Sequence, residues 1–169
     1  MTRVFVLMAG FWVLGNSVWA QGVIFAELQG QPNMITTGWN LTGAAQIGDT
    51  PGDADAFNNE LILTTAVNTT SGAAFFAQPI DMSICNRWIA SFEFRIFDGT
   101  AADGIAFCFL DVPPTGFVNG GGLGIPATAN GLKVVLDTWD NGCGLNPELQ
   151  VYSGPGYGEC LTSLFKIQN

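Results

Sequence analysis

The clearest alternation of apolar and polar side chains along the chain lies in residues 87–97, RWIASFEFRIF. Phe92, Phe94 and Ile96 fall on one face of an extended chain, and charged residues alternate with them on the other face. A period of two is typical of an antiparallel strand that has one buried and one solvated face. The pattern therefore predicts a half-exposed strand over these residues.

Other apolar segments predict further strands. Residues 104–110, GIAFCFL, and residues 132–136 are apolar at nearly every position, so both are expected to form buried strands. Residues 60–67 are rich in Leu, Ile and Thr, and residues 73–80 return after a short turn, so their spacing predicts a hairpin. Shorter strand-like pieces cover residues 22–28 and 39–45.

Polar and glycine-rich segments separate the predicted strands. Residues 49–59 form a polar loop whose Asp49, Asp53 and Asp55 are either solvated charges or calcium ligands. Residues 119–124, NGGGLG, form a glycine-rich loop. Short strands, tight turns and the lack of any helical period together predict a single all-β sandwich domain.

Composition excludes several functions. The chain has 169 residues with a formal net charge of −9 and only 5 Lys and Arg residues, so it offers no basic patch for a nucleic-acid partner. It has no histidine, which excludes His-dependent acid–base catalysis, Ser-His-Asp triads and His-ligated zinc. Hydrophobic residues make up 48% of the chain, enough to form a core.

Residues 1–20 have the features of a signal peptide. Arg3 gives a positive start, residues 4–14 are apolar, and residues 18–20 offer a small-residue cleavage site. An uncleaved anchor is the alternative, although the apolar run is short for a membrane span. We expect the domain, residues 21–169, to be secreted or to lie at the cell surface without inserting into the membrane.

Four cysteines in an exported chain indicate two disulfides, for which three pairings exist. Cys143 and Cys160 flank one strand-and-turn unit, which favours that pair. Cys85 with Cys108 follows by elimination, and the alternative is that Cys108 remains a buried thiol inside its apolar run.

The loop after the strand at residues 132–136 carries candidate metal ligands. Asp137, Asn141 and Asn146 place oxygen atoms within one turn that follows a buried strand. Calcium prefers such carboxylate and amide oxygens. The alternative interpretation is a plain polar turn, because Asn, Asp and Gly are ordinary turn residues.

Four blocks of sequence together resemble the L-type (legume-type) lectin domain, which has a concanavalin A-like fold, and in particular its bacterial members. The blocks are LTTAVNTTSGAAFFAQPIDMS, FEFRIFDGTAADGIAF, GGGLG and VVLDTWDNG, and they occur within residues 38–153 in the family's order and spacing. The resemblance implies a jelly-roll sandwich of antiparallel sheets. Because such sandwiches run to roughly 200–250 residues, we expect this one to be incomplete at its C-terminal side, either as part of a longer chain with further domains or as a trimmed fold.

The resemblance also implies a sugar site formed by three loops. Asp103 would accept hydrogen bonds from sugar hydroxyls, Gly121 would donate its backbone N–H, and Asn141 would both donate and accept. Trp139 would pack its ring against the sugar, although a tryptophan can equally be a core residue. The family holds the peptide bond before this aspartate in the cis conformation, so the same is expected before Asp103.

In this family calcium fixes the third loop. The implied ligands are Asp137, the backbone carbonyl of Trp139, Asn141 and Asn146. Family members usually carry aspartate where Asn146 stands, and lower ligand charge weakens calcium binding.

Glu148 and Asp140 are the candidates to replace that charge. A second, transition-metal site is expected to be absent, because its ligand positions fall at Val135 and approximately at Val151.

The sequence therefore predicts a carbohydrate-binding domain with glycans or glycoconjugates as partners. One alternative is an adhesive or structural segment of a larger surface protein in which the sugar site has degenerated. A glycoside hydrolase of related fold is the other, but hydrolysis needs two facing carboxylates. The E-x-D-x-x-E pattern of related glucanases does not occur in the chain.

Overall fold

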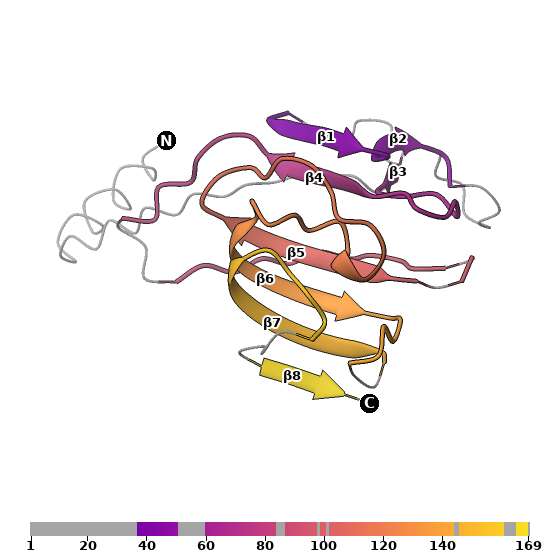
Figure 1. The fold of residues 1–169 in the computed structure, drawn as a ribbon. Helices are drawn as coiled ribbons and strands as arrows, with labels where there is room; N and C mark the ends of the chain where they lie inside the picture. Colours follow the sequence, from indigo (N-terminus) through magenta and orange to yellow (C-terminus); the bar gives the residue numbers. More distant parts are fainter. Residues whose placement is uncertain are drawn as a thin grey trace, which may run out of the picture. The chain divides into compact units, whose positions relative to one another are not determined.

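The structure is a computed structural model with an all-β architecture of antiparallel sheets (Figure 1). The residues that it describes are 37–50, 60–83, 87–97, 99–100, 102–143, 146–160 and 165–168. The chain divides into two units, and the described residues 80–83 and 87–90 of the smaller unit contain no strand. No helix in the described ranges is long and apolar enough to cross a membrane. The all-β sandwich class expected from the sequence is confirmed.

Four strands form the larger sheet, in the order β5-β6-β7-β8. Each strand pairs antiparallel with the next in sequence, so the sheet is a meander. The strands are β5 (Gly104–Leu110), β6 (Asn130–Asp137), β7 (Glu148–Pro155) and β8 (Phe165–Gln168). The registers Gly104↔Asp137 and Asp137↔Glu148 bring one end of three strands together at Asp137.

The two faces of this sheet differ in chemistry. Alternate residues of β6 and β7 are buried on one face, and most of them are polar or charged. These residues are Lys133, Val135, Asp137, Glu148, Gln150 and Tyr152. The opposite face carries the intervening apolar residues of β5, β6 and β7, which are only partly buried or exposed: Ile105, Phe107, Phe109, Leu132, Val134, Leu136, Leu149 and Val151. Because side chains alternate along a strand, the sequence pattern separates the two faces.

A small core holds the polar face against residues 123–129. Ile125, Ala129, Val135 and Tyr152 are buried together, with relative exposures of 5%, 1%, 0% and 5%. Lys133 lies on the same face, and its ammonium donates hydrogen bonds to backbone carbonyls, including that of Ala129 at 3.0 Å. A buried ammonium requires such acceptors, since an unpaired buried charge is costly.

Four shorter strands form two further antiparallel pairs. They are β1 (Trp39–Gly43), β2 (Gln46–Gly48), β3 (Glu60–Ile62) and β4 (Gly72–Phe76). β1 pairs with β4, and β2 pairs with β3. The hairpin predicted between residues 60–67 and 73–80 is therefore wrong, because β3 pairs with β2 and β4 pairs with β1.

Residues 63–71 form an excursion of the chain that connects β3 to β4. Their two ends meet, since a Cβ atom added to Gly72 would lie 1.9 Å from the carbonyl oxygen of Leu63. This excursion contacts the glycine-rich loop: the Asn119 amide donates to the Thr69 carbonyl at 3.0 Å, and the Ser71 hydroxyl donates to the Asn119 side chain. The contacts hold the start of the glycine-rich loop against a distant part of the chain.

Two other predicted strands differ from the structure. Residues 87–97 form no strand, and Phe92, Phe94 and Ile96 are 55%, 46% and 39% exposed. Alternation alone does not produce a strand, because a strand also requires a partner backbone at hydrogen-bonding distance. β5 is only partly buried, since it is the edge strand of the meander with β6 as its one neighbour in the sheet.

The described residues test part of the remaining sequence predictions. The short strand predicted at residues 39–45 is confirmed as β1. The signal peptide, the strand at residues 22–28, Cys85 and most of the loop at residues 49–59 lie outside the described residues. Cys143 and Cys160 form the predicted disulfide, whereas Cys108 is a free cysteine. The pairing of Cys85 with Cys108 is therefore wrong, and Cys108 is a free thiol that is partly buried.

We predict that Cys108 resists alkylation in the folded protein. Burial raises the pKa of its thiol to about 11, against a smaller opposing effect of Lys133, so the reactive thiolate is scarce at pH 8. Iodoacetamide labelling followed by peptide mass spectrometry should leave Cys108 unmodified in the native protein and modify it in urea. Rapid labelling of the native protein, or Cys108 found in a disulfide, would contradict the assignment.

Candidate functional site

Asp137 is the last residue of β6 and is fully buried, with a relative exposure of 0%. One carboxylate oxygen accepts a hydrogen bond from the backbone N–H of Trp139 at 3.2 Å. The other oxygen lies 2.8 Å from the hydroxyl of Tyr157, which donates to it. The strand-end aspartate therefore turns the following loop back on itself and holds the segment after β7.

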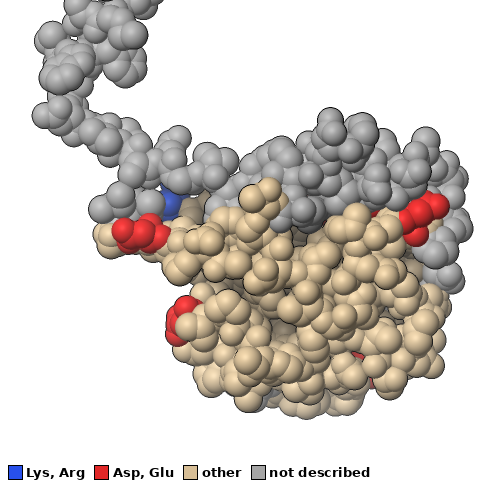
Figure 2. Space-filling view, turned by 90° about the horizontal axis from the view of Figure 1, so that it is seen from above, with Lys and Arg blue, Asp and Glu red and all other residues tan. Residues whose placement is uncertain are grey.

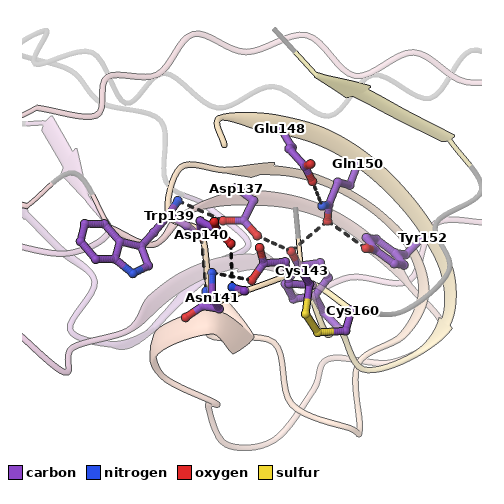
Figure 3. The surroundings of a disulfide bond; sticks show 12 residues. Asp137, Trp139, Asp140, Asn141, Cys143, Glu148, Gln150, Tyr152 and Cys160 are labelled. Carbon is purple, nitrogen blue, oxygen red and sulfur yellow. Dashed lines mark hydrogen bonds between the residues drawn. A yellow bond between two sulfur atoms is a disulfide. The ribbon is translucent and has the colours of Figure 1, made fainter. Parts of the chain in front are cut away.

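A row of polar side chains continues from Asp137 along β7 (Figure 3). The Tyr152 hydroxyl donates to the side-chain oxygen of Gln150 at 2.9 Å, and the Gln150 amide donates to Glu148. Tyr152 and Tyr157 pack edge to face, with ring centroids 5.0 Å apart. Burial raises the pKa of both phenols, so they remain protonated donors at neutral pH.

The charge on Asp137 is poorly compensated. Burial raises the pKa of its carboxyl, hydrogen bonds from Tyr157 and Trp139 lower it in part, and the nearby charges of Glu159 and Glu148 raise it again. Within the described part of the chain, neither Asp137 nor Glu159 has a lysine or arginine partner. Such a site favours a cation, because a cation reverses this local electrostatic balance.

The disulfide links the loop after β6 to the segment after β7. Cys143 and Cys160 join with a Cα–Cα distance of 5.1 Å (Figure 3). The bond places Glu159 against the loop, where the backbone N–H of Asn141 donates to Glu159 Oε2 at 3.0 Å. Glu159 is 5% exposed, and its Oε1 has no hydrogen-bond partner.

Buried side-chain atoms without partners mark the same loop. Besides Glu159 Oε1, both amide atoms of Asn146 are buried without a hydrogen bond. Asn146 precedes a cis peptide bond to Pro147 and lies two residues before Glu148, the cross-strand partner of Asp137. Orphaned buried oxygens are costly unless an ion or water completes them. The residues present therefore fit a hard cation, although no three Asp, Glu, Cys or His side chains gather in the described residues.

Asp103 lies on a second loop, just before β5. The peptide bond between Ala102 and Asp103 is cis, as expected from the resemblance. The backbone N–H of Thr138 donates to the Asp103 carbonyl at 2.8 Å, which joins this loop to the one after β6. Burial, followed by the charge of Glu159, raises the pKa of the Asp103 carboxyl.

Gly121 brings the glycine-rich loop into the same region. It lies in η1, a single 3₁₀ turn spanning Gly120–Gly122. A Cβ atom at Gly121 would lie 2.7 Å from the side-chain Nδ2 of Asn141, so a larger residue here would have to displace that side chain. The loops that carry Asp103, Gly121 and Asn141 thus meet through the residue pairs Thr138–Asp103 and Gly121–Asn141.

Trp139 presents an aromatic surface beside these loops. Its side chain is 48% exposed, so it is not a core residue. Its carbonyl oxygen accepts a hydrogen bond from the Asn141 side chain at 3.3 Å. On the face seen in Figure 2, most of the described surface is uncharged and acidic side chains form small separate spots. An exposed indole among polar groups suits a neutral ligand that has both apolar and hydroxylated sides.

Sequence reasoning missed part of this arrangement. Asp140 and Glu148, the predicted replacement charges, accept hydrogen bonds from the Gly142 N–H at 2.6 Å and from Gln150 (Figure 3). The roles of Gln150, Tyr157 and Glu159 were not predicted. The available signal for Glu159 was its place next to Cys160, since the favoured disulfide brings that part of the chain to the loop after β6.

We predict that Gly121→Ala destabilises the protein. The added methyl would displace the end of the exposed Asn141 side chain, and such a surface change costs about 0.5 kcal/mol in the free energy of unfolding. The matched control is Gly48→Ala, because a Cβ atom there meets only the Ile62 methyl at an ordinary 3.7 Å. Urea unfolding should show a lower midpoint for Gly121→Ala alone. Equal midpoints for the two variants would contradict the tight Gly121–Asn141 contact.

Comparison with known proteins assigns the chain to a family. A search of curated proteins found no match. The sequence model of the Legume-like lectin family matches residues 39–160, from the first residue of β1 to the second cysteine of the disulfide. The matched residues include Asp103, Gly121, Trp139 and Asn141. Since the match extends over well more than half of the chain, this protein belongs to the legume-like lectin family.

Proposed function

We propose that this protein is a non-catalytic carbohydrate-binding domain, exported to the cell surface or the medium, whose sugar site is formed by Asp103, Gly121, Asn141 and Trp139. The observation that carries the proposal is the convergence of three loops from separate parts of the chain. The backbone of Thr138 joins the loop after β6 to the loop that carries Asp103. Gly121 joins the glycine-rich loop to the same loop after β6 through its contact with Asn141. Family membership supports carbohydrate as the ligand class.

The chemistry of these groups matches that of a sugar. Neighbouring hydroxyls need acceptors and donors, which the Asp103 carboxylate, the Asn141 amide and the Gly121 N–H supply between them. A sugar ring also has an apolar C–H side, for which the half-exposed Trp139 indole offers a flat partner.

Calcium is the proposed structural ion of the third loop. Asp137, the Trp139 carbonyl, Asn141 and Asn146 would hold it, and the orphaned Asn146 amide supports that assignment. When bound, the ion supplies a fixed positive charge that anchors the loop. The residues of the chain itself present the sugar-binding groups, so the ion takes no part in any bond breaking.

We predict that Asp103→Ala abolishes or strongly weakens glycan binding. Loss of a hydrogen bond to a charged group costs about 1.5–3 kcal/mol, which corresponds to about 10- to 150-fold in affinity. A glycan array with wild type, Asp103→Ala and the exposed control Glu93→Gln, each with calcium and with EDTA, measures the effect. Wild type and Glu93→Gln should share the same bound glycans.

Two results would count against this function. Failure of wild type to bind any glycan with or without calcium would leave an adhesive or structural segment with a degenerate sugar site. Equal binding by wild type and Asp103→Ala would place the sugar elsewhere on the protein. Release of reducing sugar from polysaccharides would instead indicate a hydrolase.

We also predict that the role of Trp139 depends on aromaticity. Trp139→Ala removes the flat surface and should weaken binding of the best glycan by about tenfold, since a buried aromatic contact contributes more than 1 kcal/mol. Trp139→Phe keeps a ring and should retain most of the affinity. Isothermal titration calorimetry compares the three proteins. An identical dissociation constant for Trp139→Ala and wild type would exclude the stacking role.

A further inference from the structure

The carboxylate of Glu159 is a buried polar group that the proposed sugar and calcium ligands leave unused. It is 5% exposed, yet it comes from the segment after β7 and not from the loop that carries the other candidate ligands. One of its oxygens accepts the Asn141 N–H, and the other has no hydrogen-bond partner.

Position and charge link Glu159 to the candidate cation site. Its carboxylate accepts the backbone N–H of Asn141 at 3.0 Å, and its second oxygen is buried without a partner. Asp137 and Glu159 are two buried carboxylates that repel each other, and they are unfavourable without a counter-charge. A divalent cation between Asp137 and Glu159 converts this repulsion into attraction.

We propose that Glu159 is a ligand of the calcium site and supplies, through Oε1, the second carboxylate that the loop at residues 137–146 lacks. This inference rests on the calcium site of the proposed function. Asn141 would then hold Glu159 in place with its backbone N–H while its side chain faces Gly121.

The disulfide accounts for how a distant residue reaches the site. Cys160 directly follows Glu159, and Cys143 lies two residues after Asn141, so the bond ties both sides of the Glu159–Asn141 contact. A covalent tie of this kind raises the local concentration of the carboxylate at the loop. Glu159 Oε1 is a buried carboxylate oxygen without a hydrogen-bond partner, whereas Asp140 accepts the Gly142 N–H and Glu148 accepts from Gln150.

The test is calcium binding to the whole protein, measured by titration calorimetry after removal of metal with EDTA. Glu159→Gln keeps an oxygen for the Asn141 N–H but removes the charge, and should bind calcium at least about tenfold more weakly. The control Glu93→Gln changes an exposed carboxylate and should bind calcium as wild type does.

Stability provides a readout that a purely packing role would not reproduce. In EDTA, Glu159→Gln should be as stable as wild type or more stable, because a buried unpaired charge has been removed. In saturating calcium, wild type should become the more stable protein, since a ligand stabilises the state that binds it. Lower stability of Glu159→Gln by the same amount in both conditions would overturn the proposal.

A rescue variant keeps the proposal testable if Glu159→Gln does not fold. Asn146→Asp added to Glu159→Gln returns one carboxylate to the site and should restore calcium-dependent folding and binding. Calcium affinity in Glu159→Gln equal to wild type overturns the role of Glu159 alone. No calcium binding by wild type overturns the metal site as well, and the glycan array then decides separately whether sugar binding survives.

Discussion

Burial of a carboxylate at the end of β6 is the constraint on which the candidate site depends. Asp137 has no exposed surface, so its oxygens require partners from the protein or from an ion. The Trp139 N–H determines the turn of the following loop, and the Tyr157 hydroxyl holds the segment after β7. Through these two bonds, one charged group joins the loop after β6 to the segment after β7, which the disulfide also links. The same burial makes a cation favourable at this position.

The meander has two faces because two kinds of packing meet in one sheet. Its apolar face, with Phe107 and Val134, has the composition of a layer that packs against another sheet. Its polar face packs against residues 123–129, and Lys133 on this face donates to backbone carbonyls. The proposed sugar site therefore lies at the end of a sheet whose polar face continues as a buried network from Asp137 to Tyr152.

Local chemistry was predictable from the sequence, whereas long-range pairing was not. Asp103, Gly121 and Asn141 each sit in short segments with recognisable glycine and asparagine turns, so their place on loops could be read directly. The β1–β4 and β2–β3 pairs join strands that are separated by other segments of the chain. The spacing of apolar residues along the sequence does not reveal which strands pair. The alternation of residues 87–97 predicted a strand that the structure does not contain. The role of Glu159 was not predictable from the sequence, because Glu159 reaches the loop after β6 only when the disulfide brings its segment there.

The nested pairing of β1 with β4 has a consequence for the order of folding. β5, β6 and β7 pair with their neighbours in sequence, across residues 111–129 and 138–147, so their contacts close shorter loops than the bond from Asn119 to Thr69 does. The glycine-rich loop instead depends on Asn119 bonding to Thr69 and Ser71, which lie near the ends of the β1–β4 ribbon. Contacts between residues distant in sequence form slowly. In the proposed sugar site, the loops that carry Asp103 and Asn141 can therefore form early with the meander. The loop that carries Gly121 depends on contacts between distant residues and forms later.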